Sequence, residues 1–136
     1  GYYYNGYIYG SEIARGLDVF KLTPTADLTQ NEIDAANLVH FDRLNPQSQP
    51  KLVWPAAFPV ARAYLDQLKR DNGLSAARTA AIGSALDAAE QASGAKRVSA
   101  LKKLASELST DAKGASDATR VRALAGVVKG LETAKS

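Results

Sequence analysis

The stretch VARAYLDQLKRDNGLSAARTAAIGSALDAAE, residues 60–90, decides the fold. Its larger apolar residues recur at spacings of three and four, which is typical of amphipathic helices. The first apolar stripe contains Val60, Tyr64, Leu65 and Leu68, and the second contains Ile82, Leu86 and Ala89. Asn72-Gly73 is a typical helix stop and Ser75 a typical N-cap. The stretch therefore predicts two helices with a short link between them.

The same periodicity continues to the end of the chain. A third stripe contains Val98, Leu101, Leu104, Ala105 and Leu108, and a fourth contains Val121, Leu124, Val128 and Leu131. Ser116 or Asp117 is suited to cap the last helix. Short links at Asn72-Gly73 and Ser93-Gly94 favour antiparallel neighbours. Residues 59–136 are therefore predicted to form an antiparallel bundle of three to four short helices. Gly83, Gly126 and Gly130 fall inside these helices, and close packing between helices is the usual reason for tolerating them.

The N-terminal residues 1–24 have a different character. Tyr2-Tyr3-Tyr4-Asn5-Gly6-Tyr7-Ile8-Tyr9 places aromatic residues on both sides of Asn-Gly, which is a strong hairpin signal. A second extended run covers residues 17–22 and ends before Pro24. This segment is predicted to be a β-hairpin or small meander. Three strands alone are barely stable in water, so a helix, a partner chain or further strands must cover them.

Residues 25–58 connect these two parts. Thr29 and Glu32 have the spacing of a capping box, so a helix is predicted from about Gln30 to about His40. A Pro-rich linker follows, because the prolines between residues 45 and 59 prevent regular structure. The predicted fold class is mainly α: a short β segment, a Pro-rich linker and a helical bundle.

The composition excludes several chemistries. The chain of 136 residues is 46% apolar and carries a net charge of +3, with no cysteine or methionine. The absence of cysteine removes disulfides and thiolate chemistry. His40 is the only histidine, and a single histidine at a helix end is more often a cap. No nucleophile elbow, phosphate loop or dinucleotide motif occurs. We predict no catalytic residue, cofactor, metal or small-molecule substrate, and no run long enough to span a membrane.

Aromatic residues are the candidate contact residues. They are Tyr2, Tyr3, Tyr4, Tyr7, Tyr9 and Trp54. Tyrosine suits interfaces because its ring is apolar and its hydroxyl can form hydrogen bonds. The alternative is that these rings merely cover the sheet and stack across its strands.

The C-terminal residues are basic. Residues 95–136 contain nine lysines and arginines and four acidic residues, a balance of +5, which leaves −2 for the rest. Such a surface could bind nucleic acid or another anionic polymer. The cations, however, mix with Ser and Thr and have no aromatic residues between them. A solvated helix surface is therefore the favoured interpretation, and nucleic acid the less favoured partner.

Two segments carry a family resemblance. Residues 4–12, YNGYIYGSE, and 15–22, RGLDVFKL, resemble the last blade of secreted bacterial β-propeller proteins with LVIVD repeats. The segment 50–55, PKLVWP, with the helices after it, resembles the tail of such proteins. The resemblance implies a fragment of a longer, secreted or cell-surface protein. The predicted function is a non-enzymatic interaction module whose Tyr-rich segment pairs with a sheet of the parent propeller, a partner chain or a second copy. The alternative is anionic-polymer or nucleic-acid binding through the basic helices.

Overall fold

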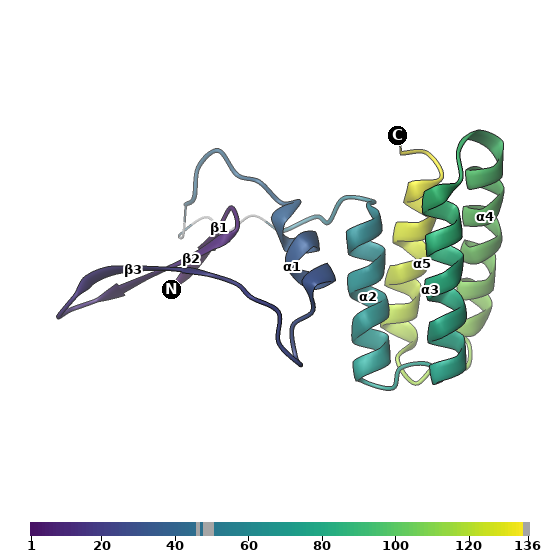
Figure 1. Ribbon diagram of the computed structural model, residues 1–136, viewed down its shortest axis with the longest axis horizontal. Helices are drawn as coiled ribbons and strands as arrows, with labels where there is room; N and C mark the ends of the chain where they lie inside the picture. The colour runs from purple at the N-terminus through teal and green to yellow at the C-terminus, as the bar shows by residue number, and fades with distance from the viewer. Residues whose placement is uncertain (46, 48–50, 135–136) are drawn as a thin grey trace.

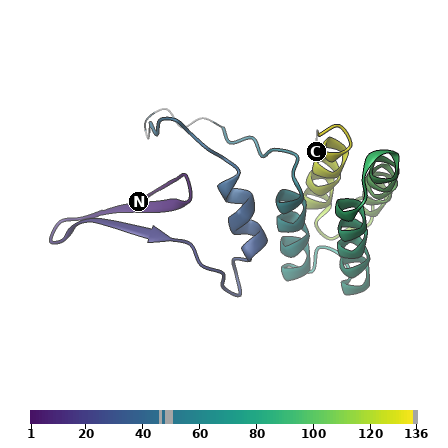
Figure 2. The same ribbon diagram turned by 45° about the horizontal axis from the view of Figure 1, so that its top comes forward.

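The computed structural model describes residues 1–45, 47 and 51–134. The molecule is elongated, with a small sheet at one end and a bundle of helices at the other (Figure 1). A short helix, α1, lies between them, and the turned view in Figure 2 shows the same order. The predicted fold class, mainly α with an N-terminal β segment and a helical bundle, is confirmed.

The sheet is a three-stranded antiparallel meander in the order β1-β2-β3. Its strands are Tyr2–Tyr4, Tyr7–Glu12 and Gly16–Lys21. Asn5 and Gly6 connect the first two strands with positive φ angles of 47° and 92°. Positive φ at both central positions is what a type I′ turn requires, so the predicted Asn-Gly hairpin is confirmed.

Helix α1 spans Gln30–Asn37 and begins with the predicted capping box. Thr29 accepts a hydrogen bond from the Glu32 amide, and the Glu32 carboxylate accepts one from the Thr29 amide. The helix ends three residues before the predicted end at His40. The amides of Leu38 and Val39 bond to carbonyls three residues back, which tightens the last turn and ends the helix there.

The bundle contains four helices: α2 Phe58–Arg70, α3 Ala76–Gln91, α4 Gly94–Asp111 and α5 Ala118–Leu131. Each helix packs on the next, and α5 returns to pack on α2. Ser75 caps α3, and Asp117 rather than Ser116 caps α5. The short links make neighbours antiparallel, as predicted.

The bundle core is built from the predicted stripes. The side chains that are fully or almost fully buried in it are Leu68, Ile82, Leu86, Leu101, Leu104, Leu108, Val121, Leu124 and Val128. Val60 is also buried, but it packs with Ala35 and Ala63 in a separate cluster between α1 and α2. This second cluster is one of the contacts that attach α1 to the bundle.

Arginines bridge the helices at the surface. Arg62 of α2 pairs with Asp87 and Glu90 of α3, and Arg78 of α3 pairs with Glu107 and Asp111 of α4. Likewise, Arg120 of α5 pairs with Asp71 and Asp117. Each such pair contributes at most about 1 kcal/mol. Together these three arginines form ion pairs with most of the acidic side chains of the bundle.

The two glycines inside α5 differ in their surroundings, and this gives a prediction. A Cβ on Gly130 would lie 2.6 Å from the Ala56 Cβ, whereas one on Gly126 would have no atom within 4 Å. We expect Gly126→Ala to raise the free energy of unfolding by about 0.5–1 kcal/mol, because alanine favours helix. Gly130→Ala should lower it, because Ala56 must move. Urea titrations followed by circular dichroism measure both, and equal effects would contradict the difference.

Candidate interaction surface

Neither face of the β sheet is covered by a helix that the structure describes. The register pairs Tyr2 with Tyr9 and Tyr9 with Val19, so these three side chains share one face. Tyr3, Ile8 and Phe20 align in the same way on the other face. No helix in the described part of the chain packs across either face. As a result, several apolar residues of the sheet remain exposed, at 65% for Leu17, 51% for Val19 and 53% for Phe20.

The sheet is attached to the rest of the molecule through its first turn. The Tyr3 hydroxyl donates to the Asn37 side chain at 3.0 Å, at the end of α1. The Tyr4 hydroxyl donates to the Phe41 carbonyl at 2.9 Å. The Asn5 side chain both donates to that carbonyl and accepts from the Phe41 amide, each at 2.9 Å. These bonds fix the hairpin end, while β3 and the far turn extend away from the helices (Figure 1).

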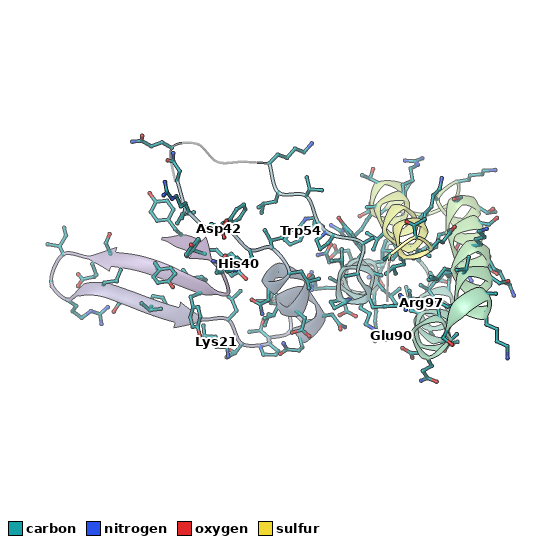
Figure 3. The ribbon with its side chains drawn as sticks, turned by 90° about the horizontal axis from the view of Figure 1, so that it is seen from above. Lys21, His40, Asp42, Trp54, Glu90 and Arg97 are labelled. Carbon is teal, nitrogen blue, oxygen red and sulfur yellow. The ribbon has the colours of Figure 1, made fainter. Side chains whose placement is uncertain are left out.

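The predicted contact residues fall into two groups. Tyr2, Tyr3 and Trp54 border one hollow of about 590 Å³ between the sheet, α1 and the segment before α2. The other three do not border this hollow: Tyr7 is exposed, and Tyr4 and Tyr9 contact each other with ring centroids 6.4 Å apart. Figure 3 shows Trp54 between the sheet end and the bundle. The structure therefore brings three of the six predicted contact residues together at one hollow.

No catalytic arrangement appears in the described part of the chain. His40 is exposed and lies near Asp42 on the segment after α1 (Figure 3). Among the described residues, no group of three or more His, Asp or Glu side chains could hold a metal ion. The described helices include none with the length and hydrophobicity to cross a bilayer.

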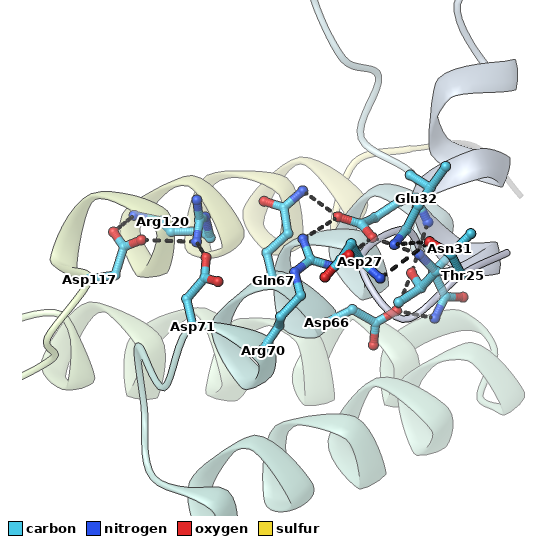
Figure 4. A network of polar contacts seen from close by, with 12 residues as sticks. Thr25, Asp27, Asn31, Glu32, Asp66, Gln67, Arg70, Asp71, Asp117 and Arg120 are labelled. Carbon is cyan, nitrogen blue, oxygen red and sulfur yellow. Dashed lines mark hydrogen bonds and ion pairs between the residues drawn. The ribbon is translucent and has the colours of Figure 1, made fainter. Parts of the chain in front are cut away.

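One carboxyl has a strongly shifted pKa, and its cause is structural. The Arg70 guanidinium donates two hydrogen bonds to Glu32, at 2.9 and 3.0 Å, and holds the pKa of Glu32 at about 2, below its ordinary 4.5. Partial burial opposes this shift, and the Thr29 amide and the Gln67 side chain add to it. Beside it, Asp66 of α2 accepts from Thr29 and Asn31 (Figure 4). These two carboxylates fasten α1 to α2.

Sequence reasoning missed this clamp and also the neighbours of the basic helices. The hydrogen bonds that Glu32 and Asp66 make between α1 and α2 join residues 35 to 38 positions apart. The sequence therefore indicated only the local capping box at Thr29. The structure also brings Trp54 and Tyr64 beside α5, although no aromatic residue occurs among its cations in the sequence. Comparisons of the chain with protein-family models, curated proteins and solved structures find no match.

Proposed function

We propose that this chain is a non-enzymatic interaction module whose β sheet is completed by another protein sheet. That sheet belongs to a partner chain, a second copy or the remainder of a longer polypeptide. The observation that supports this most directly is the exposure of Leu17, Val19 and Phe20 on two sides of the same strand. A three-stranded sheet that leaves apolar side chains exposed on both faces gains little hydrophobic stabilisation. A partner would supply the missing burial.

The edge strand β3 offers the means of recognition. It is six residues long and pairs only with β2 among the described strands, so its outer backbone groups are available. An added strand would bond to these groups, and the alternating side chains of β3 would give specificity. The two hydroxyl anchors at Tyr3 and Tyr4 would hold the sheet in place while it binds.

The resemblance to LVIVD-repeat propellers supports one form of this proposal. Propeller blades usually contain four strands, and β1–β3 would supply three of them. The fourth strand and the neighbouring blades would then cover the sheet. A secreted or cell-surface location follows from the same resemblance and belongs to the same proposal.

The sheet proposal predicts a loss of association without a loss of helix. We expect the chain to self-associate in sedimentation experiments, and Tyr7→Ser/Tyr9→Ser to shift it toward the 14.4 kDa monomer. Helical circular dichroism should not change, because neither tyrosine contacts the bundle core. A matched control is Leu38→Ser/Val53→Ser, which removes two exposed apolar side chains outside the sheet.

Hydrogen exchange distinguishes the remaining cases. If the chain is a monomer and its β2 and β3 amides exchange rapidly, the sheet is unstable without a partner. This result is expected for a chain whose partner is a different protein. A monomer whose sheet amides are as protected as those of α4 would contradict the proposal, because that sheet would be stable alone.

A further inference from the structure

A cationic hollow lies between α4 and α5 on the surface of the bundle. Its volume is about 480 Å³, and its floor is made of small residues such as Ala105, Ala125 and Gly126. Three cations, Lys113, Arg122 and Lys129, border it, and no acidic side chain does. The hollow is therefore shallow, open and positively charged.

These cations are free to act on a ligand. Arg62, Arg78 and Arg120 each pair with two carboxylates, whereas Lys113, Arg122 and Lys129 form no ion pair with any residue that the structure describes. Their charges are consequently uncompensated. Such a cluster attracts anions and raises their local concentration.

An aromatic hollow adjoins the cationic one. It measures about 460 Å³ and lies between α5 and residues 51–56, with Trp54, Tyr64 and Lys51 on its wall. Both hollows include Gly126, which is exposed and has no atom within 4 Å of its Cβ position. Because Gly126 has no side chain, no side chain at this position separates the two hollows. A glycine inside a helix costs about 1 kcal/mol relative to alanine, and no contact within the described chain explains this one.

We infer that this surface of α5 binds single-stranded nucleic acid, with the strand crossing Gly126. Phosphates would contact Arg122, Lys129 and Lys113, and a base would stack on the half-exposed Trp54 ring. Cations alone would suit any polyanion. The adjoining indole ring is what favours a ligand with aromatic bases, because such proteins combine a positive groove with stacking side chains. This inference is independent of the sheet and its partner.

The single tryptophan of the chain makes the inference directly testable. A twenty-nucleotide oligo(dT) should quench the indole fluorescence of the full chain, because stacking brings a base against Trp54. Three phosphate contacts predict a slope of log K against log salt of about −2, or about a twentyfold loss of affinity for a fourfold rise in salt. Inorganic polyphosphate serves as the probe that has the charge but no bases.

Three variants locate the site. Arg122→Gln/Lys129→Gln should reduce the salt slope by about 1.4 and lower affinity at low salt by about tenfold. Gly126→Leu should keep the helices intact and lower affinity, because its side chain would separate the two hollows. Lys96→Gln/Lys103→Gln removes the same charge from exposed positions of α4 that do not border the hollow, and should leave binding nearly unchanged.

Three outcomes would overturn the inference. The first is no binding of oligo(dT) at low salt. The second is polyphosphate binding as tightly as oligo(dT) while oligo(dT) leaves the fluorescence unquenched, which would indicate a general polyanion surface. The third is an equal loss of affinity in the Lys96/Lys103 control, which would indicate net charge rather than a site.

Discussion

Leu108→Ala is expected to lower the free energy of unfolding by about 3 kcal/mol, the largest effect of any single change proposed for this protein. Leu108 of α4 is completely buried in the bundle core. Truncation removes its transfer free energy and leaves a cavity that rigid neighbouring helices cannot close. Small domains have a total stability of about 5–15 kcal/mol, so the loss is a large fraction of the whole.

The composition of the core increases this sensitivity. Several of its buried positions are alanines, including Ala61, Ala89 and Ala112, which bury little area each. Stability is therefore concentrated in the leucines and the few Val and Ile side chains. Thermal unfolding of Leu108→Ala should shift the midpoint downward by about 10 °C. Leu38→Ala is the matched control, since Leu38 is 42% exposed and should change stability by less than about 1 kcal/mol. Equal effects of the two changes would mean that this core is not what holds the bundle together.

The helices of the bundle were predictable because their signals are local. Apolar spacing defines each stripe, and side-chain caps within a few residues define the ends, as at Ser75 and Asp117. The hairpin was predictable for the same reason, since Asn5 and Gly6 alone determine the turn. The end of α1 was misplaced by three residues, because no cap or glycine marks it in the sequence, whereas the predicted strand at 17–22 and the bundle start at 59 were each displaced by one residue.

The arrangement of these elements was not predictable, because it depends on distant pairs. Tyr3 and Asn37 are 34 positions apart, and the packing of Trp54 beside α5 spans a still longer separation. Gly126 and Gly130 lie one turn apart in the same helix, and close packing was expected for both. Only Gly130 is closely packed, because Ala56 lies against α5 at that position. The spacing of apolar residues indicates which face of a helix is buried, but not which residues pack against that face. The two hollows beside α5 could therefore be identified only from the structure.

Glu32→Gln is expected to weaken the attachment of α1 to the bundle without unfolding the other helices. The Glu32 carboxylate completes the capping box and accepts two hydrogen bonds from Arg70. A glutamine at position 32 can still accept from the Thr29 amide through its side-chain oxygen, so the loss is mainly that of the charged hydrogen bonds from Arg70, and the opening free energy of α1 should fall by about 1 kcal/mol. Hydrogen exchange measures this directly, as faster exchange of α1 amides with unchanged protection in α4. Asp34→Asn is the control, since the side chain of Asp34 bonds, among the described residues, only to Gln30 of the same helix.

The same carboxylate gives α1 a pH dependence with a defined sign. The pKa of Glu32 is about 2 in the folded protein and close to 4.5 when the chain is unfolded, because only the folded state has Arg70 beside it. The stabilisation is therefore complete above pH 4.5 and is lost as the pH falls from 4.5 toward 2. Arg70 lies at the surface, where solvent screens the pair, so the loss should be about 1 kcal/mol. In Glu32→Gln the position no longer titrates, and the opening of α1 should vary less with pH across this interval. If wild type and Glu32→Gln show the same acid dependence of α1 exchange, another group controls the docking, and the clamp to α2 contributes little to it.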